Sequence, residues 1–169
     1  MKVWLASLAM VTGLAACSAE QQKVAVDPGK YQVKSAQELQ QRFNDLNSKL
    51  AQDFQQFKKL ESIAFSHQLP LDVNNLQTLN QHPVSRTALK SSKVAYCDMM
   101  NGYFAEMYRL GHYNLNLLDE IQLPKAENED LKSNFVSSDQ FYTFILDRYT
   151  TYRQVQQTMN YGCNLKAAL

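Results

Sequence analysis

The stretch that decides the fold runs from residue 35 to residue 69: SAQELQQRFNDLNSKLAQDFQQFKKLESIAFSHQL. Its apolar residues recur mostly at steps of four and three, the spacing that places side chains on one face of an α-helix. They are Leu39, Phe43, Leu46, Leu50, Phe57, Leu60 and Ala64, with Phe54 beside Asp53 where the spacing breaks. No Pro or Gly interrupts the stretch before Pro70. We therefore predict one long helix of about 30 residues.

Serine residues mark where this helix and the later ones begin. Ser35 and Glu38 have the spacing of a capping box, in which the two side chains satisfy free backbone amides of the first turn. Ser85 is placed to cap a second long helix, and Ser137 or Ser138 to cap a third. Three long helices are therefore predicted.

Apolar stripes follow the second and third caps. The second helix is predicted over 85–121, with Gly111 as a kink or as a point where a neighbouring backbone comes close. The third is predicted to end near residue 161, with Gly162 as its C-terminal signal. The second stripe comprises Leu89, Tyr96, Met100, Tyr103 or Phe104, Met107 and Leu110. The third comprises Phe141, Phe144, Ile145, Tyr149, Tyr152, Val155 and Met159.

The segments between these helices are short. Residues 71–83 form a connector with room for a brief helix, and residues 124–136 are acidic, irregular and read as a loop. Scarce Gly (5) and Pro (4) favour helix over a turn-rich β fold. The predicted fold is all-α, an up-down bundle of three long helices plus a short connecting helix over residues 35–169.

The cysteines of the helical region predict a disulfide. If the second and third helices are antiparallel, Cys97 lies about 24 residues before Ile121 and Cys163 about 25 after Ser138, at nearly one height. An even number of cysteines in an oxidising compartment favours pairing, so we predict one Cys97–Cys163 disulfide. The alternatives are two buried free thiols or a metal site, although no His lies at ligand spacing from either cysteine.

The first sixteen residues have the parts of a secretory signal. Lys2 precedes an apolar stretch, VWLASLAMV (3–11), which is too short to span a bilayer. Leu14-Ala15-Ala16-Cys17 follows, and resembles the bacterial lipobox. The resemblance implies cleavage before Cys17, a diacylglycerol on its thiol, and usually a third acyl chain, palmitate, on its amine. The alternatives are an ordinary signal peptide cut near a cysteine, or a retained transmembrane helix, which the polar residues 18–22 oppose.

The lipobox resemblance also implies a location. An Asp after the lipidated cysteine retains such proteins in the inner membrane of enteric-type bacteria, whereas this chain has Ser18. We therefore expect the outer membrane, with the protein facing the periplasm and attached through its lipid. Residues 1–16 are then the signal peptide, 17–34 the lipidated N-terminus and a flexible tether, and 35–169 the bundle.

Signals of catalysis, cofactors and metals are scarce. The chain has no G-x-S-x-G, H-E-x-x-H, Walker, Rossmann or C-x-x-C-H motif. The scattered histidines are His67, His82 and His112. The methionines Met99, Met100 and Met107 are better explained as core than as copper or haem ligands. We predict a non-enzymatic protein without metal or cofactor.

The charge balance disfavours nucleic acid as a partner. The chain has 17 Lys and Arg against 16 Asp and Glu, and cleavage removes Lys2, which leaves the mature chain close to neutral. Nucleic-acid binding requires a basic face.

Tyrosines are numerous on the second and third predicted helices. They are Tyr96, Tyr103, Tyr108, Tyr113, Tyr142, Tyr149, Tyr152 and Tyr161. A three-helix bundle does not easily bury eight hydroxyls, and half-exposed tyrosines are favoured in binding sites. Candidate partner-binding residues are Tyr103, Tyr108, Tyr142 and Tyr149; the alternative is a core boundary with each hydroxyl in water.

These features favour an envelope lipoprotein that docks a protein partner. A small outer-membrane lipoprotein with a disulfide-stapled helical domain resembles the helical pilotins of type II secretion, which hold a secretin segment in a groove between helices. The resemblance is one of architecture and carries over no residue. The alternatives are a carrier of an apolar small molecule or lipid between the helices, and an enzyme with an unrecognised site.

Overall fold

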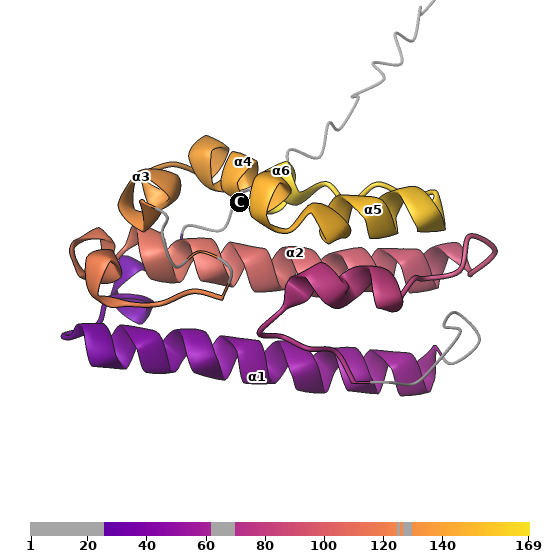
Figure 1. Ribbon diagram of the computed structural model, residues 1–169, viewed down its shortest axis with the longest axis horizontal. Coiled ribbons are helices and arrows are strands. Elements are labelled where there is room, and N and C mark those ends of the chain that lie inside the picture. The colour runs from indigo at the N-terminus through magenta and orange to yellow at the C-terminus, as the bar shows by residue number, and fades with distance from the viewer. Residues whose placement is uncertain (1–25, 62–69, 125, 127–129) are drawn as a thin grey trace, which may run out of the picture.

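The computed structural model describes residues 26–61, 70–124, 126 and 130–169 (Figure 1). The regular elements in these ranges are helices, and one disulfide joins Cys97 to Cys163. The predicted all-α bundle is therefore confirmed. Helix α1 (Ala36–Leu60) forms one layer, α2 (Lys90–His112) lies beside it, and the C-terminal helices cover the opposite side of α2.

Helix α1 begins as predicted. The Ser35 hydroxyl accepts a hydrogen bond from the Glu38 amide at 3.2 Å, while the Glu38 carboxylate accepts from the amide of Lys34 at 3.1 Å. Its core-facing side chains are buried, namely Leu39, Phe43, Leu50, Phe54 and Phe57. The helix ends at Leu60, whose side chain is exposed, and the predicted continuation over 62–69 lies outside the described residues.

Helix α2 starts later than predicted. Its N-cap is Leu89, and Ser85 instead accepts a hydrogen bond from the Thr87 amide at 3.2 Å in a local turn. Such turns compete with helix capping for the same hydroxyl. The helix continues through Gly111 to His112, after which residues Leu115–Glu120 form a 3-10 helix, η4, rather than a continuation of α2.

The predicted loop over 124–136 contains a short helix, α3 (Leu131–Phe135). Asp130 caps it, since its carboxylate accepts a hydrogen bond from the Ser133 amide at 3.1 Å. Phe135 is fully buried and packs against the rings of Phe43, Phe141 and Phe144. The loop assignment is wrong here because tertiary burial of one aromatic side chain orders a segment without helical periodicity of its own.

The third predicted helix is divided in two. Helix α4 (Ser138–Arg148) is capped by Ser137 as expected, and α5 (Thr150–Met159) follows after a break at Tyr149. No Pro or Gly explains this break. It coincides with the burial of the Tyr149 ring against Phe104 and Phe144.

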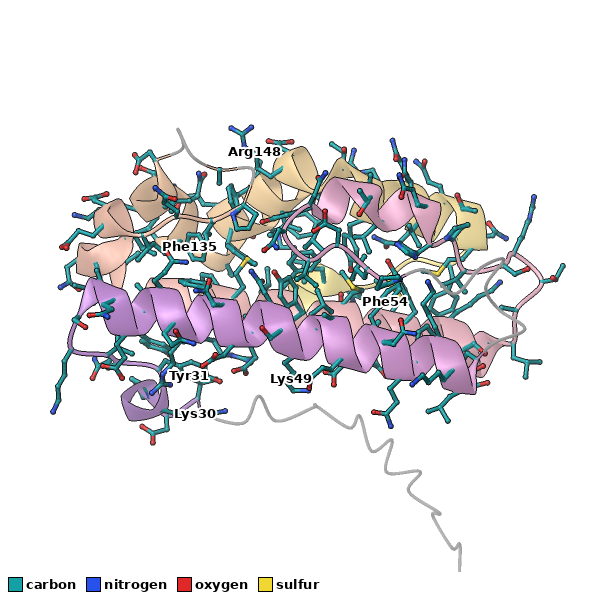
Figure 2. All side chains as sticks on the ribbon, turned by 60° about the horizontal axis from the view of Figure 1, so that its bottom comes forward. Lys30, Tyr31, Lys49, Phe54, Phe135 and Arg148 are labelled. Atoms are coloured by element: carbon teal, nitrogen blue, oxygen red, sulfur yellow. A yellow bond between two sulfur atoms is a disulfide. The ribbon has the colours of Figure 1, made fainter. Side chains whose placement is uncertain are left out.

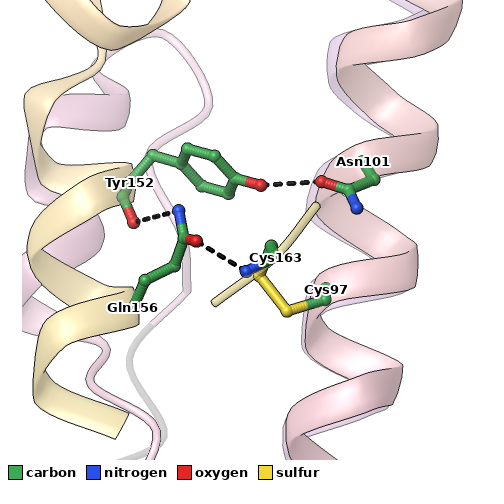
Figure 3. The surroundings of a disulfide bond; sticks show 5 residues. All are labelled: Cys97, Asn101, Tyr152, Gln156 and Cys163. Atoms are coloured by element: carbon green, nitrogen blue, oxygen red, sulfur yellow. Dashed lines mark hydrogen bonds between the residues drawn. A yellow bond between two sulfur atoms is a disulfide. The ribbon is translucent and has the colours of Figure 1, made fainter. Parts of the chain in front are cut away.

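The C-terminal segment folds back toward α2. Helix α5 ends at Asn160, which has a left-handed conformation (φ 50°), so the C-terminal signal lies two residues before the predicted Gly162. The chain then reaches Cys163 and the short α6 (Leu165–Ala168). The Cα atoms of Cys97 and Cys163 lie 5.0 Å apart, and the Gln156 side chain accepts a hydrogen bond from the Cys163 amide at 2.6 Å (Figure 3).

The connector before α2 packs against α5. It contains a 3-10 helix, η3 (Leu76–Gln81), within the connector where the sequence predicts a brief helix. The buried Thr151 hydroxyl donates a hydrogen bond to the Leu76 carbonyl at 2.6 Å, and Leu76 and Leu79 are fully buried. This segment therefore closes the side of the bundle between α1 and α5 (Figure 1).

Residues 26–34 belong to the folded domain rather than to a free tether. They contain a 3-10 helix, η1 (Pro28–Lys30), and the following Tyr31 is only 4% exposed. The buried Asn114 side chain holds this segment: it accepts from the Val33 amide at 2.9 Å and donates to the carbonyls of Tyr31 and Leu110. The boundary predicted at residue 35 is wrong because one buried amide residue anchors the chain some 80 positions away.

Replacing Asn114 with alanine is expected to lower the free energy of unfolding by about 2 kcal/mol, because buried backbone groups lose their partners. Chemical denaturation followed by circular dichroism measures this loss. Hydrogen exchange of the Val33 amide should also become faster. The exchange rates of amides in the middle of α5 should change only as far as global stability changes. An unchanged Val33 amide would show that the segment is held by other contacts.

Candidate functional site

The four candidate tyrosines do not form one surface. Tyr149 is 2% exposed, and burial raises its pKa to about 12. Tyr103 is 5% exposed and donates a hydrogen bond from its hydroxyl to the Asn47 side chain at 2.7 Å, and burial raises its pKa well above the ordinary value. Tyr108 and Tyr142 are half-buried. Tyr149 is therefore a core residue, and its ring is not available to a partner.

Tyr108 packs against the rings of a histidine and a phenylalanine. Its hydroxyl lies 3.3 Å from His112 Nδ1, and its ring packs on Phe141 at 5.3 Å between centroids. His112 Nδ1 also lies 3.0 Å from the Phe135 carbonyl, a pairing in which the imidazole nitrogen donates. This contact fixes the ring between α2 and α3, a structural role.

A groove of about 490 Å³ lies between α1 and α2. Its apolar lining consists of Leu46, Leu50, Met99, Gly102 and Tyr103. A second, smaller hollow of about 220 Å³ shares Lys30, Leu46, Lys49 and Glu106 with it and extends to Tyr31, Arg42, Asp45 and Leu110. The two hollows therefore form one continuous depression, the α1/α2 groove. Figure 2 shows Lys30, Tyr31 and Lys49 on this side of α1, whereas Phe54 and Phe135 lie on the core side.

Gly102 leaves the centre of the groove open. A β-carbon built at Gly102 meets no atom within 4 Å, and the residue is exposed in the interior of α2. Leu50 and Tyr103 beneath it are buried, while Leu46 and Met99 are half-buried. The groove thus offers an apolar floor with no side chain above its middle.

Charged groups line the two ends of the groove. At one end, Glu106 accepts hydrogen bonds from the Tyr31 hydroxyl at 2.8 Å and from Arg109 at 2.9 Å. The Lys30 ammonium lies 3.4 Å from the same Tyr31 hydroxyl. Nearer the other end, Lys49 pairs with Asp53.

Three of the charges that line the groove, those of Lys30, Asp45 and Asp98, have no ion pair among the described residues. Lys30 belongs to the end that holds Arg109, and Asp98 lies on the lining about three turns earlier in α2. The Lys30 end is lined by three cations, Lys30, Arg42 and Arg109, against the two anions Asp45 and Glu106. The other end is lined by Asp53 and Asp98 against Lys49, so the two ends carry net charges of opposite sign.

The remaining sequence candidates lie elsewhere. Met100 and Met107 are buried in the core as predicted, whereas Met99 lines the groove. His82 is buried with its Nδ1 2.8 Å from the ammonium of Lys58, whose pKa burial lowers. His67 and Cys17 lie outside the described residues. Within the described ranges, no three His, Cys, Asp or Glu side chains gather as metal ligands would.

Sequence reasoning missed this groove because it joins distant residues. Lys30, Leu46 and Gly102 come from three segments, and none of them stands out in its own segment. The only local signal is Gly102 itself, a costly residue in the interior of a helix.

Comparisons with protein-family models, with curated proteins and with solved structures found no match for this chain. None of the described helices combines the length and apolar character needed to cross a bilayer.

Replacing Gly102 with alanine is expected to raise the free energy of unfolding by about 1 kcal/mol, because alanine favours the helix and meets no neighbour. A urea titration followed by circular dichroism measures the gain. A loss of stability would mean that this position is covered in solution, which contradicts an open groove.

Proposed function

We propose that this protein is a non-enzymatic docking lipoprotein of the bacterial outer membrane, facing the periplasm. Lipid on Cys17 attaches it to the membrane, and the α1/α2 groove binds a segment of an envelope protein. The lipobox at Leu14–Cys17 supports the location. The observation that carries the docking role is the groove's apolar floor, open at Gly102 and bordered by charged side chains.

A narrower form of this proposal is a pilotin-like role, in which the groove holds a segment of a secretin. The groove between two helices of a disulfide-stapled bundle favours it. An apolar carrier is less well supported, because charged side chains from both helices border the groove, among them Lys49 and Glu106.

Site-specific crosslinking in living cells tests the proposal. A photo-crosslinking amino acid replaces Met99 in the groove, and a matched control replaces Thr158, an exposed residue of α5 on the opposite side of α2. We expect one dominant envelope protein to be captured from position 99 and not from position 158. Capture should weaken in a Cys17→Ala copy, because an unanchored protein no longer shares the membrane with its partner.

Equal capture at positions 99 and 158, or no protein captured at position 99, would contradict docking at the groove. Capture of a secretin at position 99 would establish the pilotin-like form, and another envelope protein would exclude it while retaining the docking role.

A further inference from the structure

We infer that the occupant of the α1/α2 groove is an amphipathic α-helix of about three turns, with its N-terminus toward Asp98 and its C-terminus toward Lys30 and Arg109. This inference rests on the proposed docking function and adds the conformation and direction of the bound segment. It is carried by the groove's length, the chemistry of its walls and the separation of its charges.

The length of the groove fits a short helix. Asp98 and Arg109 both line it and lie eleven positions apart on α2, which corresponds to about 16 Å at 1.5 Å per residue. An α-helix of about eleven residues covers that distance, whereas an extended segment needs only about five. Eleven helical residues provide anchors at i, i+3, i+4 and i+7, enough to fill the apolar floor.

The walls of the groove offer no site for strand addition, in which an extended segment is held by backbone hydrogen bonds. Strand addition requires a row of unpaired backbone groups on the receiving protein. Along the groove both long walls are helices, α1 and α2, whose interior amides and carbonyls bond within the helix. A bound helix satisfies its own backbone and needs only apolar contact. The missing side chain at Gly102 lets a helix approach the floor closely, since nothing stands above that position.

The charges of the groove set the direction of the bound helix. The Tyr31 hydroxyl lies next to the Lys30 ammonium and donates a hydrogen bond to Glu106, so Lys30 lies near Glu106. Arg109 donates a hydrogen bond to the same Glu106 carboxylate. Asp98 precedes Glu106 by eight positions on α2, about 12 Å along the axis. A helix has partial positive charge at its N-terminus and partial negative charge at its C-terminus. The favourable direction therefore puts the N-terminus near Asp98, parallel to α2.

Crosslinking from two positions tests both conformation and direction in the lipidated protein. Photo-crosslinking residues replace Met99 and Arg109 in separate copies, and mass spectrometry identifies the partner residue joined to each. These positions lie about 15 Å apart. We expect the partner residue joined to position 99 to precede the one joined to position 109 by about ten residues.

Other results overturn the inference in distinguishable ways. A separation of about four or five residues would mean an extended occupant, and the opposite order would mean the reverse direction; both leave the docking role intact. Capture of a second copy of this chain, or of no protein at either position, would overturn the docking proposal as well.

Charge reversal gives an independent test of direction. Asp98→Lys is expected to weaken capture from position 99 about two- to fivefold, the size of a helix-terminus interaction. Asp147→Lys on the exposed face of α4 is the matched control and should leave capture unchanged. Both variants should keep the parent's unfolding midpoint within error. Equal capture by the Asp98→Lys variant and the parent would overturn the assigned direction.

Discussion

Removing the Cys97–Cys163 disulfide is expected to lower the free energy of unfolding by about 4 kcal/mol. The two cysteines are 66 positions apart, and a crosslink over a loop of that size restricts the unfolded chain by about this amount. In the native state the bond joins the C-terminal segment to α2, next to the hydrogen bond between Gln156 and the Cys163 amide. A loss of this size corresponds to a fall of roughly 15 °C in the unfolding temperature.

The measurement is chemical denaturation of the Cys97→Ala/Cys163→Ala double variant beside the oxidised parent. Reduction of the parent with a thiol should give the same destabilisation, which controls for the packing of the new alanine residues. A difference in the free energy of unfolding below about 1 kcal/mol would mean that residual structure in the unfolded chain keeps positions 97 and 163 close together without the disulfide. The single variant Cys163→Ala should match the double variant, since the remaining Cys97 is buried and unpaired.

Replacing Gly111 with alanine is expected to lower the free energy of unfolding by about 3 kcal/mol. A β-carbon at Gly111 lies 2.1 Å from Phe135 Cδ1 and 2.5 Å from Cε1, far inside van der Waals contact. Phe135 is fully buried against Phe43 and Phe141, so its ring has little room to move. The overpacking cost exceeds the roughly 1 kcal/mol that alanine gains in helix propensity.

Gly102→Ala is the matched control because the same change, in the same helix, meets open space. The two variants should differ by about 4 kcal/mol in denaturation experiments, with opposite signs. Adding Phe135→Leu to Gly111→Ala should recover part of the loss, because the smaller side chain makes room for the methyl group. A neutral Gly111→Ala variant would mean that α3 shifts away from α2 at no cost.

The contrast between these glycines shows where sequence reasoning stops. Gly102 and Gly111 are equivalent in the sequence, both within one predicted helix, and Gly111 was expected to mark a kink or a neighbouring backbone. The neighbour is instead a phenylalanine ring from α3. That helix lies in a segment whose acidic, irregular sequence predicts a loop. Burial of Phe135 depends on residues from α1 and α4, which no local pattern contains.

Burial of the tyrosines depends on distant residues in the same way. Helical periodicity placed Tyr103 and Tyr149 on their stripes, but it did not indicate how deeply each ring would be covered. The Tyr103 hydroxyl donates a hydrogen bond to Asn47 on α1, and the Tyr149 ring packs at the break between α4 and α5. Tyr96 is buried with no hydrogen-bond partner for its hydroxyl among the described residues, an outcome that composition gives no means to foresee.

Short-range patterns were enough to predict the helical class, the start of α1, the cap of α4 and the pairing of two cysteines. Each depends on spacing within a few turns or on the number of cysteines, so local chemistry settles it. The division at Tyr149, the docking of residues 26–34 and the α1/α2 groove required the folded chain. The division coincides with packing of the Tyr149 ring on Phe104 and Phe144. The other two arise where Asn114 bonds the Val33 amide and where the Tyr31 hydroxyl joins Lys30 to Glu106. Such contacts join residues some 75 to 81 positions apart, and their energy exists only once the bundle has assembled.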